Sequence, residues 1–356
     1  MNGAAPEFAI AGRRIGADAP PYVIAEMSAN HNGSLERALE MIDEAAATGC
    51  DAIKIQTYTA DTITMDIDRP EFRIAGGLWD GRTLHDLYQE AQTPYEWHAA
   101  LFARAAERGV TLFSSPFDET AVDLLDELGA PAFKIASFEA VDLPLIRYAA
   151  GKGKPLIIST GMASLAEIET ARSAALEAGA AGVVLLHCVS SYPAALSDAN
   201  VRTIADMAQR FDGPVGLSDH THGTAASVAA VALGASVIEK HFTLARADGG
   251  PDAAFSLEPA EFAALVRDCK DAWTALGTAH YDVLGSERGS LQFRRSLYVS
   301  ADVRAGEPLT RANVRSIRPG NGLPPAELEA VLGRPAARDL KRGEPLAWDM
   351  IGGSAR

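Results

Sequence analysis

The sequence has few cysteines, no apolar run of membrane length and a deficit of basic side chains. Three cysteines, Cys50, Cys188 and Cys269, are an odd number without the spacing of metal ligands, so we expect reduced thiols rather than a disulfide framework. No window resembles the roughly 20 apolar residues of a membrane span, and the N-terminus lacks the apolar core of a signal peptide. We therefore expect a cytoplasmic protein.

Charge excludes one class of partner. Lysine and arginine number 32 against 47 aspartates and glutamates, which gives a net charge of −15. Nucleic-acid binding depends on a basic surface that neutralises phosphates, so this balance argues against it. A small anionic substrate is still compatible, because a few lysines that converge in a cleft create a local positive field. We expect small-molecule substrates, and neither nucleic acid nor a membrane.

Eight short β-branched or apolar runs alternate with segments of helical periodicity. The runs are PPYVIAEM, AIKIQTY, TLFSSPF, FKIAS, PLIIST, VVLLHCV, VGLSDHT and VIEKHF. Continuous hydrophobic strands of this kind are typical of a parallel sheet covered by helices on both faces. Eight strand–helix units over roughly 250 residues predict an α/β fold, a (β/α)8 TIM barrel, with a doubly wound open sheet as the alternative.

The character of the sequence changes near Ser286. The segment DVRAGEPLTRANV at 302–314 recurs as DLKRGEPLAWDMI at 339–351. Two copies of a strand–turn–strand unit indicate a small pseudo-symmetric β-rich domain. We therefore divide the chain into an N-terminal hairpin at 1–20, a barrel at 21–285, a linker at 286–293 and a C-terminal domain at 294–356.

Polar and charged residues stand at one end of all eight predicted strands. In a TIM barrel the active site lies at the C-terminal strand ends, and burying so many polar groups costs free energy unless they serve a site. These residues are Glu26, Lys54, Gln56, Ser114, Ser115, Lys134, Ser137, Ser159, Thr160, His187, Ser190, His220, Glu239 and His241. A long excursion at 59–93 follows the second strand, and such loops generally shape substrate pockets.

Two histidines, His220 and His241, end neighbouring predicted strands and are candidate metal ligands. Side chains alternate along a strand, so His220 shares a face with Ser218 and His241 shares one with Glu239. Both imidazoles can therefore point into one cavity. An open site of this kind suits Mn²⁺ or Mg²⁺, although imidazole also suits Zn²⁺. The alternative is two core histidines bonded to the backbone.

Lys54 and Lys134 project from nearby strands, together with the hydroxyls of Ser115, Ser137 and Ser159. Such a set suits a phosphate and a carboxylate held side by side. A Schiff-base aldolase with a nucleophilic lysine is a competing hypothesis. Two histidine ligands instead favour a metal that polarises a carbonyl oxygen. A non-catalytic sugar-binding module is a third hypothesis, which does not explain two lysines beside two histidines.

Taken together, the motifs resemble the sialic acid synthase family. The matching stretches are AEMSANHNGS, KIQTYT, FSSPFD, KIAS, ISTGM, HCVSSYP, GLSDHT, EKHFT, GGPD and RPGNG. The resemblance implies a TIM barrel with a C-terminal antifreeze-like (SAF) domain, in a homodimer whose swapped SAF domains each cap the partner's active site. Members are transferases that form a carbon–carbon bond between phosphoenolpyruvate and an open-chain amino sugar. They release phosphate and use a divalent metal, commonly Mn²⁺, with Mg²⁺ or Co²⁺ as alternatives.

The resemblance also implies roles for individual residues. It makes Glu26, Lys54 and Lys134 catalytic, with Glu26 as the acid/base, and His220 and His241 the metal ligands. It implies substrate contacts for Gln56, Ser115, Ser137, Ser159, Ser190, Tyr192, Asp252 and Arg318. Arg318 would be donated to the partner's site. Ser190 departs from the family pattern, because members that make the neuraminic form carry an asparagine there, in contact with phosphoenolpyruvate.

Within the family, the resemblance is closest to members that make pseudaminic acid. It is carried by GLWDGRTLHDLYQEAQTPYEWH, KIASFE and SERGSLQFRRSLYV. It implies the sugar 2,4-diacetamido-2,4,6-trideoxy-L-altrose, with N-acetylneuraminate or legionaminate synthesis as the alternative. This sugar lacks a hydroxyl that N-acetylmannosamine has, so it presents a methyl group in place of a hydroxymethyl group. Trp79 and Phe138 are the candidates for an apolar patch against that methyl group.

Overall fold

A computed structural model describes residues 8–353 of the chain, which divide into two compact units. The first unit ends at Gly277 and the second begins at Thr278. The sequence analysis ended the barrel at residue 285, whereas residues 278–285 group with the second unit in the structure. Among residues 8–353, no helix is long and apolar enough to cross a bilayer. Cys50, Cys188 and Cys269 are buried free thiols.

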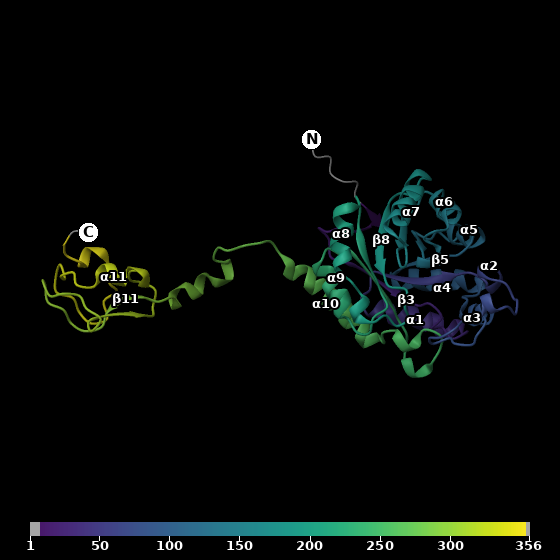
Figure 1. The fold of residues 1–356 in the computed structure, drawn as a ribbon. Coiled ribbons are helices and arrows are strands. Elements are labelled where there is room, and N and C mark those ends of the chain that lie inside the picture. The colour runs from purple at the N-terminus through teal and green to yellow at the C-terminus, as the bar shows by residue number, and fades with distance from the viewer. Residues whose placement is uncertain (1–7, 354–356) are drawn as a thin grey trace. The chain divides into compact units, whose positions relative to one another are not determined.

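The first unit contains eight parallel strands that close into a barrel in chain order (Figure 1). They are β3 (Tyr22–Glu26), β4 (Ala52–Thr57), β5 (Thr111–Pro116), β6 (Phe133–Ile135), β7 (Leu156–Ser159), β8 (Val183–Cys188), β9 (Val215–Asp219) and β10 (Val237–His241). Because β10 pairs with both β9 and β3, the sheet has no open edge. The TIM-barrel prediction is confirmed, and the open-sheet alternative is wrong.

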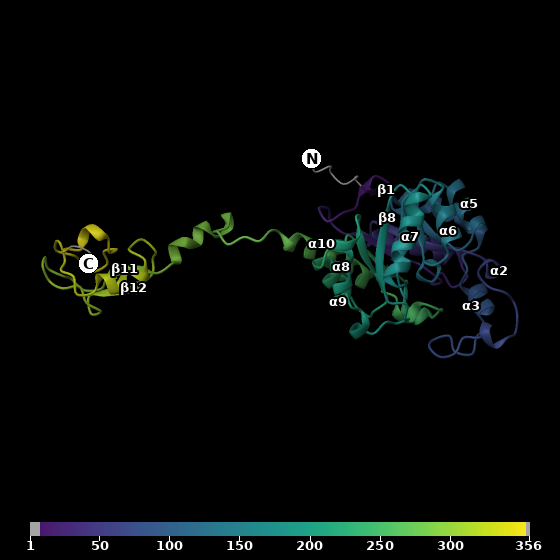
Figure 2. The same ribbon diagram turned by 45° about the horizontal axis from the view of Figure 1, so that its top comes forward.

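Helices form a layer outside the barrel, where α5, α6 and α7 lie side by side in both views (Figure 1, Figure 2). The layer comprises α1 (Leu35–Ala47), α4 (His98–Arg108), α5 (Glu119–Glu127), α6 (Leu143–Ala150), α7 (Leu165–Glu177), α8 (Arg202–Arg210), α9 (Ala225–Ala232) and α10 (Pro259–Leu276). Local sequence fixes several starts. Ser34 accepts a hydrogen bond from the backbone of Arg37, and Ser164 forms a capping box with Glu167. The main apolar core lies between these helices and the strands.

Short elements occupy the connections that follow the strands. The excursion after β4 contains α2 (Ala60–Ile63), η1 (Pro70–Phe72) and α3 (Leu84–Ala91). Other single turns are η2 (Tyr95–Trp97), η3 (Ser137–Glu139), η4 (Leu196–Asp198), η5 (Arg246–Asp248) and η6 (Ala253–Phe255). These connections surround the carboxyl ends of the strands, where the candidate site residues stand.

The N-terminal hairpin packs at the opposite end of the barrel. Strand β1 (Ala9–Ile10) pairs antiparallel with β2 (Arg13–Arg14). Ile10 and Ile15 are buried in a second apolar cluster with inward-facing strand residues such as Tyr22 and Phe113. This cluster fills the barrel interior toward the amino ends of the strands, so the polar residues gather toward the carboxyl ends.

The second unit is β-rich and reflects the sequence repeat. Strand β11 (Ser296–Val299) pairs antiparallel with β12 (Val314–Ile317), and the unit also contains η7 (Gly285–Phe293), η8 (Pro325–Glu327), α11 (Leu328–Val331) and η9 (Trp348–Met350). Val303 and Leu340 occupy equivalent positions of the repeat and exchange two backbone hydrogen bonds, at 3.0 and 2.8 Å. Leu309 and Leu346, also equivalent, are both buried in its core. The repeat therefore builds one pseudo-symmetric core.

Candidate active site

Four charged side chains meet inside the barrel. The Nζ of Lys54 lies 3.2 Å from Oε2 of Glu26 and 3.2 Å from Oε1 of Glu239. The Nζ of Lys134 lies 3.9 Å from the same Glu239 oxygen. All four side chains are at most 5% exposed. Two lysines and two carboxylates thus form one buried group, with Glu239 between the lysines.

The environment shifts the pKa values of this group apart. Burial raises the pKa of Glu26, and Lys54 only partly offsets the effect. For Lys54, burial lowers the pKa, but the adjacent Glu239 and Glu26 raise it more, so the ammonium stays charged. Burial lowers the pKa of Lys134. For Glu239, burial acts to raise the pKa, but Lys134 and Lys54 hold it well below its ordinary value. Of the two carboxyls in this group, Glu26 is therefore the one that binds a proton more readily.

Serine hydroxyls accompany the lysines. The Nζ of Lys134 donates to Oγ of Ser159 at 2.7 Å, and Nζ of Lys54 lies 3.4 Å from Oγ of Ser115. The Oγ of Ser137 accepts from the backbone N–H of Gly161 at 3.2 Å. A Cβ on Gly161 would lie 2.8 Å from that Oγ and overlap Oγ of Ser190. The absence of a side chain at Gly161 therefore lets these hydroxyls converge on one wall.

The two candidate metal ligands lie side by side. The ring centroids of His220 and His241 are 5.4 Å apart. The Nδ1 of His220 lies 2.9 Å from the carbonyl oxygen of Val189, and a proton there leaves Nε2 free as a ligand. The Nδ1 of His241 is buried without a hydrogen-bond partner. Burial, with His220 and nearby lysines, holds the pKa of His241 well below its ordinary value. His241, a neutral imidazole with an unpaired nitrogen, therefore fits a metal ligand.

Two histidines make an open rather than a complete metal site. Among residues 8–353, no group of three or more His, Cys, Asp or Glu side chains is arranged to hold a metal ion. A catalytic metal keeps coordination positions for water and substrate. The pair therefore fits a metal whose remaining ligands come from outside the chain.

Aromatic side chains cover the histidine pair. The ring of Tyr192 lies 4.4 Å from that of His220, and Phe255 lies 4.9 Å from His241. The ring centroid of Trp79, from the long excursion, lies 5.9 Å from that of Tyr192. The Nε1 of Trp79 donates a hydrogen bond to the carbonyl oxygen of Pro251 at 3.1 Å. The excursion therefore reaches the site. Phe138, the other candidate for an apolar patch, is 58% exposed.

A hydrogen-bond chain joins three predicted residues through one that sequence reasoning missed. The Nε2 of Gln56 donates to Oε1 of Glu26 at 2.9 Å and to Oγ of Ser28 at 3.0 Å. Ser28 in turn donates to Oδ2 of Asp252. Burial raises the pKa of Asp252. Ser28 lies inside the AEMSANHNGS stretch, which was the available signal for it.

Two carboxylates were also given no role by sequence reasoning. Glu239 shares a strand face with His241, and this alternation was its signal. Glu139 follows β6, and its Oε2 is buried without a hydrogen-bond partner. Burial raises the pKa of Glu139 to about 7. Both belong to the charged surroundings of Lys134.

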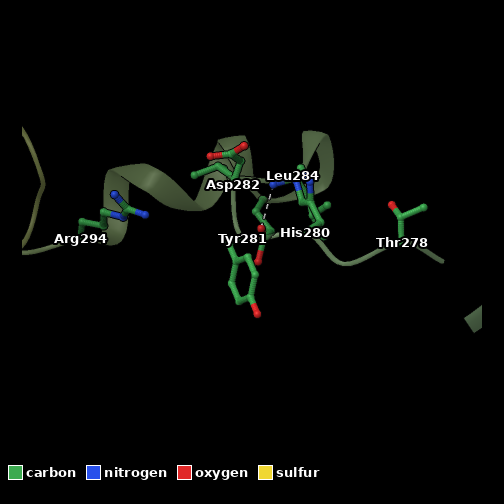
Figure 3. Close-up of a pocket in the computed structure, with 8 residues that line it drawn as sticks. Thr278, His280, Tyr281, Asp282, Leu284 and Arg294 are labelled. Carbon is green, nitrogen blue, oxygen red and sulfur yellow. Dashed lines mark hydrogen bonds between the residues drawn. The ribbon is translucent and has the colours of Figure 1, made fainter. Parts of the chain in front are cut away.

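Arg318 stands apart from these residues in the chain, exposed just after β12 in the second unit. That unit also contains a shallow hollow (Figure 3). It is lined by Thr278, His280, Tyr281, Asp282, Val283, Leu284, Glu287 and Arg294. Tyr281 is fully exposed there, and the hollow holds none of the predicted site residues. We assign no binding role to it.

Comparisons with known proteins point to one family. The NeuB family model matches residues 41–281, and the SAF domain model matches 294–352, which confirms the predicted C-terminal SAF domain. A pseudaminic acid synthase of Campylobacter jejuni is 45% identical over 92% of this chain and 96% of its own length. One of Helicobacter pylori is 41% identical over 93% of this chain and 98% of its own.

A solved structure agrees with this assignment. The N-acetylneuraminic acid synthetase of Leptospira borgpetersenii matches with a TM-score of 0.72 and 33% identity. The match covers 83% of this chain and 98% of that one.

Proposed function

Since this chain belongs to the NeuB family, we propose that it makes pseudaminic acid from phosphoenolpyruvate and 2,4-diacetamido-2,4,6-trideoxy-L-altrose. The reaction also consumes water and releases phosphate. One observation carries the proposal: two buried lysines with hydroxyl partners lie in the same barrel as two adjacent imidazoles. The pseudaminic acid synthases at 41–45% identity support the choice of sugar.

Phosphoenolpyruvate would be held by the lysines and serines. Its phosphate and carboxylate need cations and hydroxyl donors in a site that excludes water. Lys54 and Lys134 supply the cations. The hydroxyls of Ser115 and Ser159, beside the lysines, and of Ser137 and Ser190, beside Gly161, would supply donors. Glu239 balances the lysines before an anion arrives, which lowers the cost of keeping two cations buried.

The sugar would lie between the aromatic cover and the carboxylates. Gln56 and Asp252, joined through Ser28, present groups that bond to hydroxyl and acetamido groups. Trp79 and Tyr192 present apolar rings to the deoxy carbon. His220 and His241 would hold a divalent metal, Mn²⁺ by preference and Mg²⁺ or Co²⁺ as alternatives. When bound there, the metal would supply Lewis-acid polarisation of the aldehyde oxygen of the sugar.

In the reaction, the π electrons between carbons two and three of phosphoenolpyruvate form a bond from carbon three to the sugar aldehyde carbon. The aldehyde π bond breaks, its oxygen takes a proton to become a hydroxyl, and carbon two is left cationic. Water then attacks carbon two, and Glu26 takes a proton from it; the raised pKa of Glu26 suits this exchange. The tetrahedral intermediate expels phosphate by cleavage of the bond between carbon two and oxygen. Lys54 and Lys134 keep the substrate aligned while these bonds change.

An isotope experiment tests this sequence of bonds. With water labelled by oxygen-18, carbon–oxygen cleavage places the label in the sugar acid product and leaves the released phosphate unlabelled. Labelled phosphate would mean that water attacks phosphorus, which contradicts the proposed role of Glu26. Borohydride trapping tests the Schiff-base alternative, because a lysine adduct would form there and not in the proposed reaction.

A different sugar is the second candidate function. An N,N'-diacetyllegionaminic acid synthase of Legionella pneumophila is 35% identical over 93% of this chain. The same lysines, histidines and Glu26 would then make legionaminate or N-acetylneuraminate. The difference would lie in the groups near Trp79 rather than in the chemistry.

We also propose that the active enzyme is a homodimer in which each SAF domain serves the partner's barrel, with Arg318 as the donated residue. Family resemblance supports this assembly. An Arg318→Ala protein and a His241→Ala protein, both inactive alone, should regain activity when mixed. No recovery despite demonstrated subunit exchange would contradict the swap. The proposed substrate also suggests where the reaction takes place. Because phosphoenolpyruvate is a cytoplasmic metabolite, we propose that the enzyme works in the cytoplasm.

A further inference from the structure

A buried ion pair lies directly beside the two candidate metal ligands, on the other face of their strands. Asp219 ends β9 and Lys240 is its register partner on β10, each one residue before a histidine. Strand alternation turns both side chains away from the barrel interior, toward the helix layer. The Nζ of Lys240 lies 2.8 Å from Oδ2 of Asp219, and the two side chains are 0% and 1% exposed.

The carboxylate of Asp219 shapes the backbone that carries His220. Its Oδ1 accepts from the backbone N–H of Thr221 at 2.9 Å and from the Thr221 hydroxyl at 2.8 Å. This contact two residues ahead is an Asx turn, and His220 is its central residue. On the outer side, the hydroxyl of Ser227 in α9 donates to Oδ2 at 2.6 Å. The turn is thus anchored to the helix layer.

Lys240 closes the same turn from the neighbouring strand. Its Nζ donates to the carbonyl oxygen of Thr221 at 2.6 Å, besides pairing with Asp219. The carbonyl oxygen of His220, within the turn, accepts from the backbone N–H of Ala194 at 2.9 Å. The residue before His241 therefore holds the segment that contains His220. The two imidazoles are mechanically joined through this pair.

A buried ion pair is weak evidence for stability, because apolar residues of similar volume often serve as well. A buried ion pair has a clearer role where it holds the backbone around it in one conformation. We infer that Asp219 and Lys240 are positioning residues that hold His220 and His241 at the separation a divalent metal requires. The inference rests on the metal role in the proposed function.

Mn²⁺ binding to the chelator-treated full-length protein tests it without any substrate. The probe is Mn²⁺ alone, titrated while the free ion is followed by electron paramagnetic resonance. The test variant, Asp219→Asn with Lys240→Met, removes both charges at similar volume. We expect a wild-type circular dichroism spectrum and an affinity for Mn²⁺ lower by about 10- to 100-fold. His220→Ala gives the reference for a lost site.

Asp51→Asn is the matched control. Asp51 accepts from the backbone N–H of Val23 at 2.9 Å and pairs with Arg13, but it stands at the amino ends of the strands. This variant should bind Mn²⁺ as the wild type does. If the double variant fails to fold, Ser227→Ala carries the comparison, because it removes the anchor between Asp219 and α9 while both charges stay paired.

The outcomes separate the two claims. Wild-type Mn²⁺ affinity in a folded charge-free variant would overturn the positioning role and leave the metal site intact. A wild-type protein that binds no Mn²⁺ would overturn the metal role in the proposed function, and this inference with it. Equal loss of affinity in Asp51→Asn would mean that general destabilisation is the cause, which also overturns positioning.

Discussion

Lys54 and Glu239 contact each other inside the barrel, with Nζ 3.2 Å from Oε1, although β4 and β10 lie far apart in the sequence. The contact exists because β3 stands between these strands in the closed barrel and pairs with both. It keeps Lys54 cationic in a buried place. A cation held in this way is prepared to bind an anionic substrate.

Replacement of Lys54 tests whether its buried positive charge is needed for stability and for binding of phosphoenolpyruvate. Lys54→Met leaves the carboxylates of Glu26 and Glu239 without their shared cation, so we expect the free energy of unfolding to fall by about 3–5 kcal/mol. Phosphate release should fall by about 100-fold or more. Adding Glu239→Gln should restore part of the stability without restoring activity. Wild-type KM for phosphoenolpyruvate in the single variant would contradict the assigned role.

Two buried histidines offer a matched comparison. His220→Ala should abolish phosphate release and keep the far-UV circular dichroism spectrum, because the ring serves a ligand rather than the core. In His98→Ala we expect the reverse: activity retained and stability lowered by about 1–3 kcal/mol. His98 is fully buried, with Nε2 2.7 Å from the Thr57 hydroxyl and Nδ1 3.1 Å from the carbonyl oxygen of Pro94. A melted spectrum for His220→Ala would restore the core-histidine interpretation.

Trp79 should determine the choice of sugar. Its ring lies 5.9 Å from Tyr192, whereas Phe138 is 58% exposed, so Trp79 is the stronger candidate for the methyl contact. Trp79→Ala should lower kcat/KM for the L-altrose sugar by about 10-fold or more, with less effect on N-acetylmannosamine. Phe138→Ala, the matched aromatic control, should leave the ratio unchanged. An unchanged ratio in Trp79→Ala would remove this residue from the specificity argument.

Glu139 should make stability depend on pH. Burial raises its pKa in the folded protein to about 7 from an ordinary value of 4.5, so the folded state binds this proton more tightly than the unfolded state. The stabilisation is complete below about pH 4.5 and is lost as the pH rises through about 7, a change of about 3 kcal/mol. Denaturant unfolding measured at several pH values in this range should show that the free energy of unfolding falls less with rising pH in Glu139→Gln than in the wild type. Parallel curves for the two proteins would contradict the shift.

The barrel was predictable because its strands are local signals. Eight apolar runs that alternate with segments of helical periodicity are visible without any contact being known. The polar strand ends followed from the rule that barrel sites form at the carboxyl ends, and alternation placed His220 and His241 on inward faces. The structure brings these predicted residues of the first unit together inside the barrel.

Other features depend on contacts that no local pattern encodes. Ile10 and Ile15 fill the lower barrel only because strands from the whole first unit converge there. The bridge from Ser28 to Asp252 spans 224 positions of sequence. No local sequence pattern distinguishes Asp219 and Lys240 from other strand residues. Their pairing depends on the register of β9 against β10. Long-range pairing of this kind appears only once the barrel has closed.

The most direct test of the account is phosphate release from phosphoenolpyruvate with Mn²⁺, with one sugar offered in each reaction. The sugars are 2,4-diacetamido-2,4,6-trideoxy-L-altrose, N-acetylmannosamine and the legionaminate precursor. We expect release with the L-altrose sugar, and loss of that release after chelation. Release only with another sugar would contradict the substrate assignment. No release with any sugar, with Mn²⁺ restored, would contradict the enzyme assignment itself.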